Sequence, residues 1–506
     1  MKTVTTKNQS KIALEAYFDK FRKNIIGIEQ RIQTPLHSAI PVVYADWTAS
    51  GRMYSLIEDK FRNEIYPLVA NTHTDTNHTG MTMTYAYHKA QQLIKKHVGA
   101  TKNDILIASN SGMTGVVNKF QRILGLKVHE SFLPQLQFKE NEVPVVFVTH
   151  MEHHSNQTSW EETIADVVVV PPNKEGLVDI GIFKEYVQKY SSRKTKIAAI
   201  TSCSNVTGIM TPYMDIAQFM HEIDGLCFVD FACSAPYVNI NMHEADHEGR
   251  YLDAIYFSPH KFLGGPGSSG VLIFNKSLYK NTVPDNPGGG TVDWTNPWGE
   301  HKFISDIEVR EDGGTPAFLQ TIKAAMCCQL KSEMGVDNIK AREEEILDII
   351  WEELENIHNL HILADNHKKR LGVFSFYIDG LHYNLGVKIL NDRFGIQTRG
   401  GCSCAGTYGH FLLNVTQEYS KTITDMVNAG DCSTKPGWIR LSIHPTHTNN
   451  EIYFICTAIK ALSINYAEWV NDYVCDFTVG SIKPKKMDNV RHMEEAVDSC
   501  LEQNFV

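Results

Sequence analysis

Short apolar runs alternate with helix-like segments through the middle of the chain. Four of these runs are rich in branched and aromatic side chains and show no polar alternation, as expected of strands buried on both faces. They are residues 145–148, 197–200, 226–229 and 254–257. Between the second and third runs, residues 215–222 carry apolar side chains at helical spacing. The alternation predicts βαβ units and therefore a parallel sheet.

Polar and titratable residues directly follow each of the four runs. These segments are Thr149–Asn156, Thr201–Asn205, Asp230–Ala232 and Ser258–Lys261. The carboxyl ends of parallel strands lie along one edge of a sheet, and the ligands of such sheets bind there. The four segments are therefore expected to line one shared pocket.

Two glycine-containing turns are candidates for binding phosphate. Ser109–Gly115 lies between a strand-like segment, 105–107, and a helix-like segment, 116–120. A small, hydroxyl-bearing turn at a helix N-terminus favours a phosphate, because backbone N–H groups and the helix dipole both attract an anion. The other turn, Gly264–Gly270, lacks the GK[ST] ending of a P-loop and is interpreted as a tight turn before a strand at 271–274.

An acid and a lysine stand at two of the predicted strand ends. Asp230 and Lys261 could simply form a buried ion pair. Together with a phosphate site, to which Ser258 and His260 could add donors, they are the groups that pyridoxal phosphate requires. This cofactor needs an amine for a Schiff base and an acid that keeps its pyridine nitrogen protonated.

Two other groups of residues suggest a metal site. His150, Glu152 and His153 match neither the HExxH nor the HxxEH spacing, which places two imidazoles on one helical face. Cys402 and Cys404 could bind a metal together with distant histidines, but one such pair without a second is a poor zinc signature. A reactive thiol is the better hypothesis for the cysteines, and no metal is expected.

Composition restricts the class of protein further. The 506 residues are 42% hydrophobic and 21% charged, which is typical of a globular protein with a sizeable core. A net charge of −10 argues against a nucleic-acid-binding protein. The start lacks a signal-like apolar region, and the apolar stretch 452–462 is broken by Lys460, so no membrane span is expected. With 11 cysteines, read as reduced thiols, the sequence predicts a cytoplasmic protein.

The pattern changes after the predicted sheet. Residues 333–354 are charged and helical, which predicts a long connector, and 371–377 and 438–443 look like strands of a smaller α+β unit. The start of the chain is expected to pack on this unit, whereas the polar tail after Tyr473 is expected to lie at the surface. The predicted segments are an N-terminal segment 1–43, a large domain 44–330, a small C-terminal domain 331–470 and a surface tail 471–506.

The motifs together resemble the class V aminotransferase-fold enzymes that depend on pyridoxal phosphate, close to the cysteine desulfurase and selenocysteine lyase branch. The motifs that carry the resemblance, in order, are Glu152–Asn156, Ser204–Gly208, Val229–Asp230, Ser258–Lys261 and Gly314–Pro316. The resemblance runs from Tyr44 to about Ala461. It implies an α/β fold, the pyridoxal-phosphate-dependent transferase fold. Its large domain has a mostly parallel seven-stranded sheet flanked by helices, and a smaller α+β C-terminal domain follows.

The resemblance also implies roles in cofactor binding. Lys261 would form the Schiff base and act in catalysis, and Asp230 would pair with the pyridine nitrogen. His153 would stack on the ring, and Asn205 would lie near the cofactor hydroxyl and the substrate carboxylate. The phosphate would be held by Gly112, Thr114, Ser258 and His260, with Thr315 reaching it from the partner subunit of a homodimer.

Substrate binding and the reaction depend on residues late in the chain. Arg399 would clamp the substrate α-carboxylate, since a planar guanidinium binds a carboxylate with two donors. Cys404, five residues later, falls at the nucleophile position of the desulfurases. The sequence departs from the family at Cys233, where a glutamine is usual, and at Met113 in the phosphate turn. Around Cys404, the segment Arg399–Gly406 lacks the histidine-flanked cysteine of the typical branch, and extra residues follow at 407–437.

Three hypotheses follow from these residues. The first is a lyase that cleaves the C–S or C–Se bond of cysteine or a close analogue, gives alanine and an enzyme persulfide on Cys404, and passes sulfur to an acceptor protein. The second is an aminotransferase that uses a keto acid, with Cys402 and Cys404 only packing in their loop. The third is a metal hydrolase or redox protein that uses His150, His153 and the cysteines. A non-catalytic scaffold is the remaining alternative.

Overall fold

The structure is a computed structural model that describes residues 14–74, 76–485 and 491–502. It divides into two compact units. Among the described residues, the large unit consists of residues 24–26 and 48–340, and the small unit of residues 14–23, 27–47 and those from 341 onward. Helix α10 (Val336–Leu354) begins in the large unit and continues into the small one.

A seven-stranded sheet forms the centre of the large unit. In spatial order its strands are β4 (Asp104–Ser109), β12 (Gly270–Asn275), β11 (Ala254–Phe257), β8 (Leu226–Asp230), β7 (Lys196–Thr201), β5 (Val145–Thr149) and β6 (Asp166–Val170). Only β12 runs antiparallel to its neighbours. The α/β fold with a mostly parallel seven-stranded sheet is therefore confirmed, and each predicted strand lies within one or two residues of its expected bounds.

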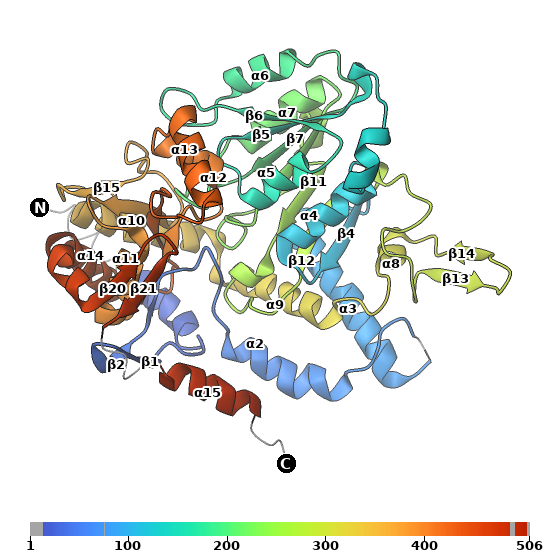
Figure 1. The fold of residues 1–506 in the computed structure, drawn as a ribbon. Helices are drawn as coiled ribbons and strands as arrows, with labels where there is room; N and C mark the ends of the chain where they lie inside the picture. The colour runs from blue at the N-terminus through green and yellow to red at the C-terminus, as the bar shows by residue number, and fades with distance from the viewer. Residues whose placement is uncertain (1–13, 75, 486–490, 503–506) are drawn as a thin grey trace, which may run out of the picture. The chain divides into compact units, whose positions relative to one another are not determined.

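Helices cover both faces of this sheet (Figure 1). Helices α4 (Gly112–Ile123) and α5 (His154–Glu161) lie on one face, and α6 (Ile180–Gln188) and α7 (Tyr213–Glu222) on the other. Phe120 of α4 packs 5.0 Å, centroid to centroid, from the rings of Phe228 and Phe274. On the opposite face, the ring of Phe147 lies 6.0 Å from that of Phe183 in α6. Apolar contact on both faces explains why the strands lack polar alternation.

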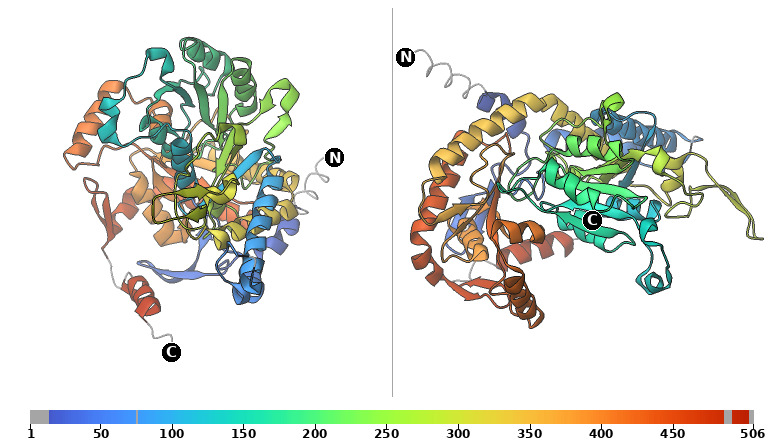
Figure 2. Two further views of the ribbon diagram at one scale, coloured as in Figure 1. Left: turned by 90° about the vertical axis from the view of Figure 1, so that its right-hand side faces the viewer. Right: turned by 90° about the horizontal axis from the view of Figure 1, so that it is seen from above.

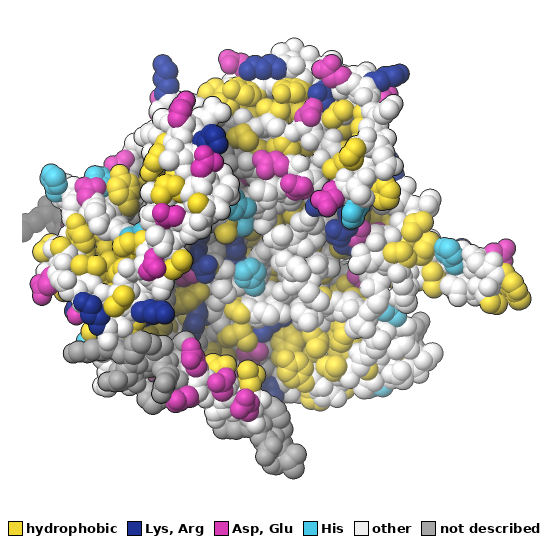
Figure 3. Space-filling view, in the orientation of Figure 1, with side chains coloured by type: hydrophobic (Ala, Val, Ile, Leu, Met, Phe, Trp, Pro, Cys, Tyr) yellow, Lys and Arg dark blue, Asp and Glu magenta, His cyan; other side chains and the backbone are white. Residues whose placement is uncertain are grey.

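The rest of the large unit packs around this core. Its further elements are α2 (Ser55–Lys60), α3 (His78–His97), β9 (His243–Ala245), β10 (Arg250–Tyr251), β13 (Val292–Thr295), β14 (His301–Phe303), α8 (Ile307–Glu311) and α9 (Phe318–Met334). Strands β13 and β14 form a hairpin, called the arm below, that projects from the unit (Figure 2). Trp294 and Trp298 on the arm are 56% and 85% exposed, and hydrophobic side chains cover its tip (Figure 3).

The small unit is built around an antiparallel sheet in the order β15-β16-β19-β18. Its strands are β15 (Leu360–Ile362), β16 (Val373–Ile378), β18 (Arg399–Gly401) and β19 (Trp438–Ser442), and β3 (Val43–Tyr44) pairs with β17 (Ile396–Gln397) beside them. Its helices are α10, α11 (Tyr383–Phe394), α12 (Gly406–Leu412), α13 (Gln417–Asn428), α14 (Asn449–Trp469) and α15 (Arg491–Glu502). Strands β1 (Arg31–Thr34) and β2 (His37–Pro41) form a separate hairpin.

Two details differ from the sequence-based expectation. The connector is not one helix, because Gly335, at a φ of 76°, separates α9 from α10. The tail forms a hairpin that the sequence did not predict, of β20 (Tyr473–Asp476) and β21 (Ser481–Pro484), although residues 474–485 are exposed or only partly buried. Tyr473 is only 5% exposed and belongs to the core of the small unit. Within the described part of the chain, no helix is both long and apolar enough to cross a membrane.

Candidate functional site

Five of the six parallel strands of the large unit carry candidate site segments at their carboxyl ends, along one edge of the sheet. These strands are β4, β11, β8, β7 and β5. Register places Asp230 opposite Thr201 on one side and Tyr256 on the other. Because the strands end together, the polar segments that follow them lie along a single edge, as the sequence predicts.

The phosphate turn is connected directly to the segment that precedes Lys261. Helix α4 begins at Gly112, and the backbone N–H of Met113 donates to Ser258 Oγ over 2.9 Å. Gly112 has a φ of 60°, and a Cβ there would lie 3.3 Å from Ser258 Oγ. Thr114 Oγ1 shares a 2.7 Å hydrogen bond with Ser155 Oγ of α5. A helix N-terminus with two hydroxyls and no Cβ at its first residue is a suitable cradle for a phosphate.

The Lys261 charge acts on two titratable residues at this edge, Asp230 and His260. Asp230 is 3% exposed, and its Oδ1 accepts from the Ala232 N–H over 2.7 Å. Burial raises the pKa of Asp230 to about 6, against the opposing effects of the Ala232 N–H and the Lys261 charge. Burial, aided by the Lys261 charge, lowers the pKa of His260 to about 4. At neutral pH the His260 imidazole is therefore neutral and Asp230 is anionic.

His153 and Asn205 occupy the loops on the other side of Asp230. His153 is the N-cap of α5, where its Nδ1 accepts from the Ser155 N–H over 3.1 Å. Asn205 is 6% exposed, in a loop closed by the Ser204 N–H donating to Ile209 O over 3.0 Å. Cys233, the residue that replaces the usual glutamine, contacts this loop, with its Sγ 3.6 Å from Ser204 O. These residues surround the strand ends as expected, and their chemical roles remain predictions.

Arg399 belongs to the small unit, where a carboxylate orients it. Its Nε and one terminal nitrogen lie 3.0 and 2.9 Å from Asp46 Oδ2. The other carboxylate oxygen, Asp46 Oδ1, accepts from Arg440 over 2.9 Å. The Arg440 side chain is 4% exposed and that of Arg399 is 53% exposed. One anion thus holds two cations, which leaves a net positive charge and an accessible guanidinium for an anionic ligand.

Cys404 lies in a tight turn of the same unit. Ser403 and Cys404 both have left-handed φ values, 52° and 56°. The Ala405 N–H donates to Cys402 O over 3.0 Å, which together with these angles defines a type I′ turn. Ser403 Oγ accepts from the buried indole N–H of Trp438 over 3.2 Å and so anchors the turn. Cys404 is exposed at the turn, whereas Cys402 is partly buried.

Two residues extend or depart from the predicted site. Asp46 was not among the predicted site residues, although it lies in the segment where the family resemblance begins; an acid directly after a short strand was its only signal in the sequence. Thr315 is exposed and lies apart from the strand-end residues. It follows Gly314, whose backbone N–H donates to Gly289 O over 2.9 Å. It therefore stands where the arm joins the unit.

Among the described residues, no group of three or more His, Cys, Asp and Glu side chains is arranged to hold a metal ion.

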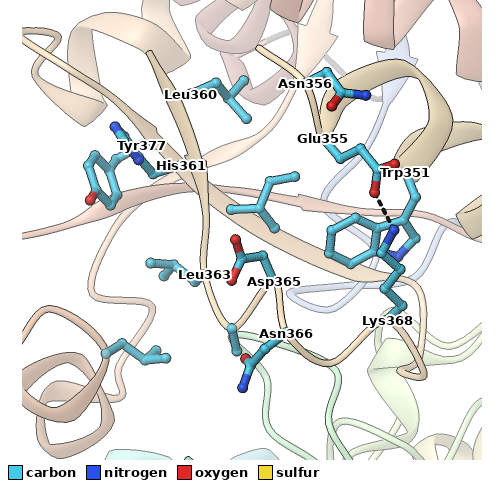
Figure 4. Close-up of a pocket in the computed structure, with 13 residues that line it drawn as sticks. Trp351, Glu355, Asn356, Leu360, His361, Leu363, Asp365, Asn366, Lys368 and Tyr377 are labelled. Atoms are coloured by element: carbon cyan, nitrogen blue, oxygen red, sulfur yellow. Dashed lines mark hydrogen bonds and ion pairs between the residues drawn. The ribbon is translucent and has the colours of Figure 1, made fainter. Parts of the chain in front are cut away.

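A separate cavity of about 690 Å³ lies in the small unit. Glu355 and Lys368 pair on one side of it, and His361 lies beside Tyr377 on the other (Figure 4). Leu412, the last residue of α12, also lines it. None of the predicted catalytic or cofactor-binding residues lines this cavity.

Comparison with known proteins places the chain among related enzymes. A family model described as aminotransferase class-V matches residues 43–454. A probable cysteine desulfurase of Halalkalibacterium halodurans is 27% identical over 72% of this chain and 84% of its own length. The cysteine desulfurase of Haloferax volcanii is 23% identical over 77% of this chain and 89% of its own. Among solved structures, the apo cysteine desulfurase of Thermococcus onnurineus matches with a TM-score of 0.70 and 20% identity, over 88% of this chain and 98% of that one. The Escherichia coli cysteine desulfurase CsdA matches with a TM-score of 0.68 and 19% identity, over 89% and 98%.

Proposed function

Since this chain belongs to the class-V aminotransferase family, we propose that it is a pyridoxal-phosphate-dependent enzyme that cleaves the C–S bond of cysteine, or the C–Se bond of its selenium analogue. Its products would be alanine and a persulfide on Cys404. The observation that carries the choice of reaction is the exposed thiol of Cys404, held in a tight turn five residues after Arg399. Relatives described as cysteine desulfurases, matched over most of the chain, support the same choice.

The residues present fit the proposed cofactor. Gly112 leaves space beside Ser258 Oγ and opens the N-terminus of α4, which suits a phosphate. Asp230, anionic above about pH 6, suits a protonated ring nitrogen, and the Lys261 charge acts on it. When bound, the cofactor supplies an electrophilic carbon for amines and a ring that withdraws electrons from the substrate Cα.

The chain's own groups would divide the remaining work. Lys261 Nζ would hold the cofactor, and would take the proton from the substrate Cα once the substrate amine has displaced it. Asp230 would accept a hydrogen bond from the ring nitrogen and keep it protonated. His153 would cover one face of the ring, and Asn205 would bind near the cofactor hydroxyl and the substrate carboxylate.

In the small unit, Arg399 would bind the substrate carboxylate while Asp46 keeps its guanidinium in one orientation. The Cys404 thiolate would attack the substrate sulfur, so that an S–S bond forms as the C–S bond breaks. The electron pair of the broken bond remains with the substrate carbon, which then takes up a proton. The sum is cysteine plus enzyme thiol giving alanine plus enzyme persulfide, which would pass its outer sulfur to an acceptor protein.

A homodimer is part of this proposal. Thr315 stands at the base of the arm, and the exposed Trp294 and Trp298 give the arm an apolar surface that a second copy would cover. Thr315 would then add a hydroxyl to the phosphate site of the partner. A cytoplasmic location is part of the proposal, because free cysteines suit a reducing compartment.

Replacing each cysteine of the turn separately tests the proposal. Cys404→Ser in the cofactor-loaded enzyme is expected to abolish the formation of alanine and sulfide from cysteine in the presence of a reductant. Cys402→Ser is the matched control, two residues away in the same turn, and should retain most of the activity. Full activity in Cys404→Ser would refute the role of the thiol. Turnover that requires an added keto acid, and is unaffected by either change, would instead identify an aminotransferase.

A further inference from the structure

Glu152 is a fully buried carboxyl group directly before His153, and four donors surround it. Its Oε1 accepts from the Thr149 N–H over 3.2 Å, the Thr149 hydroxyl over 2.7 Å and the Thr201 N–H over 2.9 Å. Its Oε2 accepts from Asn156 Nδ2 over 2.8 Å. One side chain thus joins the ends of β5 and β7 to the first turn of α5.

The orientation of Asn156 is fixed by its other partners. Its Oδ1 accepts from the Tyr256 hydroxyl over 2.5 Å and from the Trp160 indole N–H over 3.3 Å. Its Nδ2 also donates to Ala199 O over 3.1 Å. The amide therefore has only N–H groups to offer Glu152, and Glu152 Oε2 must be an acceptor in this contact.

The position of Glu152 relates two residues of the proposed cofactor site. His153 follows it in the chain, and Thr201, which donates to it, stands opposite Asp230 in the sheet. If the contacts to Thr149 and Thr201 were lost, the loop that carries His153 would lose its connection to the strand end that carries Asp230. The spacing between these two residues therefore depends on the Glu152 carboxyl.

Charge connects Glu152 to the same site. Burial raises the pKa of Glu152 to about 7, opposed by its hydrogen bonds, and the negative charge of Asp230 adds to the rise. Tyr256 of β11 faces both acids, and its pKa lies well above the usual value because of burial and these two charges, so it stays neutral. The positive charge of Lys261 has the opposite effect and lowers the pKa of Asp230. The ionisation of Glu152 is therefore linked to that of Asp230, on which the Lys261 charge also acts.

We propose that Glu152 is a positioning residue of the active site: it fixes the His153 loop against the sheet edge and supplies a second negative charge behind Asp230. The proposal rests on the proposed function in one respect, namely that a cofactor ring binds between His153 and Asp230. With both acids ionised, a proton on the ring nitrogen is held more firmly than by Asp230 alone. Loss of the Glu152 charge should therefore release that proton at lower pH.

The first test needs no cofactor. Infrared difference spectra of the apoprotein, recorded across a pH titration, detect the carbonyl stretch of a buried protonated carboxyl. We expect one component with a midpoint near 7 to be absent in Glu152→Gln, whereas the components of the buried Asp230 and Asp312 remain in that variant. In Asp230→Asn, removal of the like charge should lower this midpoint by about one pH unit. An unchanged midpoint in Asp230→Asn would overturn the coupling. Should Glu152→Gln not fold, the wild-type and Asp230→Asn titrations decide the proposal.

The second test uses pyridoxal phosphate labelled with ¹⁵N in its ring. Glu161→Gln is the matched control. Glu161 is the last residue of the same helix, α5, and it is exposed. Its carboxylate accepts a hydrogen bond from the Gln157 side chain, one turn earlier in α5. In Glu152→Gln, the dissociation constant for the cofactor should rise about tenfold. The pH at which the ring nitrogen loses its proton should fall by about one unit. Identical values for Glu152→Gln and Glu161→Gln would overturn the proposal. Failure of the wild-type protein to bind the cofactor would instead contradict the proposed function, while the infrared result would stand.

Discussion

Replacing Asp230 with asparagine should have opposite effects on the apoprotein and on the cofactor-loaded enzyme. Asparagine has the shape of a protonated aspartate and cannot ionise. The folded-state pKa of Asp230 is raised from 3.8 to about 6, because the buried carboxylate is desolvated. The folded protein therefore holds this proton after the unfolded chain has released it. Ionising Asp230 then costs folding free energy as the pH rises through this window.

The size of the effect follows from these two pKa values. The free energy of unfolding lost to Asp230 is less than about 1 kcal/mol at pH 4, about 2 kcal/mol at pH 5 and about 3 kcal/mol at pH 8. Apo Asp230→Asn should be more stable than the apo wild type by these amounts. With the cofactor bound, loss of a hydrogen bond to a charged group should weaken cofactor binding by about 10- to 150-fold.

Denaturant unfolding of the apoproteins at several pH values, and cofactor titration by absorbance, measure the two effects. Asp59→Asn is a suitable control, because this carboxylate lies exposed on α2 and should show neither effect. An apo Asp230→Asn protein that is less stable than wild type at pH 8, or stabilised equally at all pH values, would refute the reasoning. Either result would mean that neighbouring groups compensate for the burial of Asp230.

Two further substitutions test other parts of the site. Asp46→Asn should raise the KM for cysteine by about five- to tenfold with little change in kcat, because an amide no longer holds the Arg399 guanidinium in place. Steady-state kinetics measures this effect. An unchanged KM would contradict the prediction. Gly112→Ala should weaken cofactor binding by about 5- to 30-fold, since an alanine at a φ of 60° costs about 1 to 2 kcal/mol and its Cβ would press on Ser258 Oγ. Equilibrium dialysis of the cofactor measures the second effect, and wild-type affinity in Gly112→Ala would show that the turn accommodates a side chain.

The strands of the large unit could be predicted closely, because each is buried on both faces and its sequence is therefore an unbroken apolar run. The start of α4 was also predictable, since small, hydroxyl-bearing and glycine residues between a strand-like and a helix-like segment favour a turn that opens a helix. In contrast, the hairpin at Tyr473 could not be foreseen from local composition. Its surroundings are polar, and only contact with the core of the small unit buries the tyrosine.

Residues that act through distant contacts were the hardest to identify. Asp46 gains its importance from Arg399 and Arg440, which lie 353 and 394 positions later in the chain. Glu152 is part of a motif in the sequence, but its burial among donors from two strands and a helix depends on tertiary structure. Likewise, the extra residues at 407–437 gave no pattern that located helices α12 and α13. Pairing over such separations leaves no periodic signal in a single sequence.

The discontinuous small unit has a consequence for how the protein is made. Asp46 leaves the ribosome early, whereas Arg399, its partner, is added 353 residues later. At about 5 to 20 residues per second, this interval is about 18 to 70 s. During that time the sheet of the large unit can be completed, while the segment with β3 has no strand β17 to pair with. A nascent chain stalled before Arg399 should therefore expose this early segment to proteases or chaperones, even though the large unit is already whole.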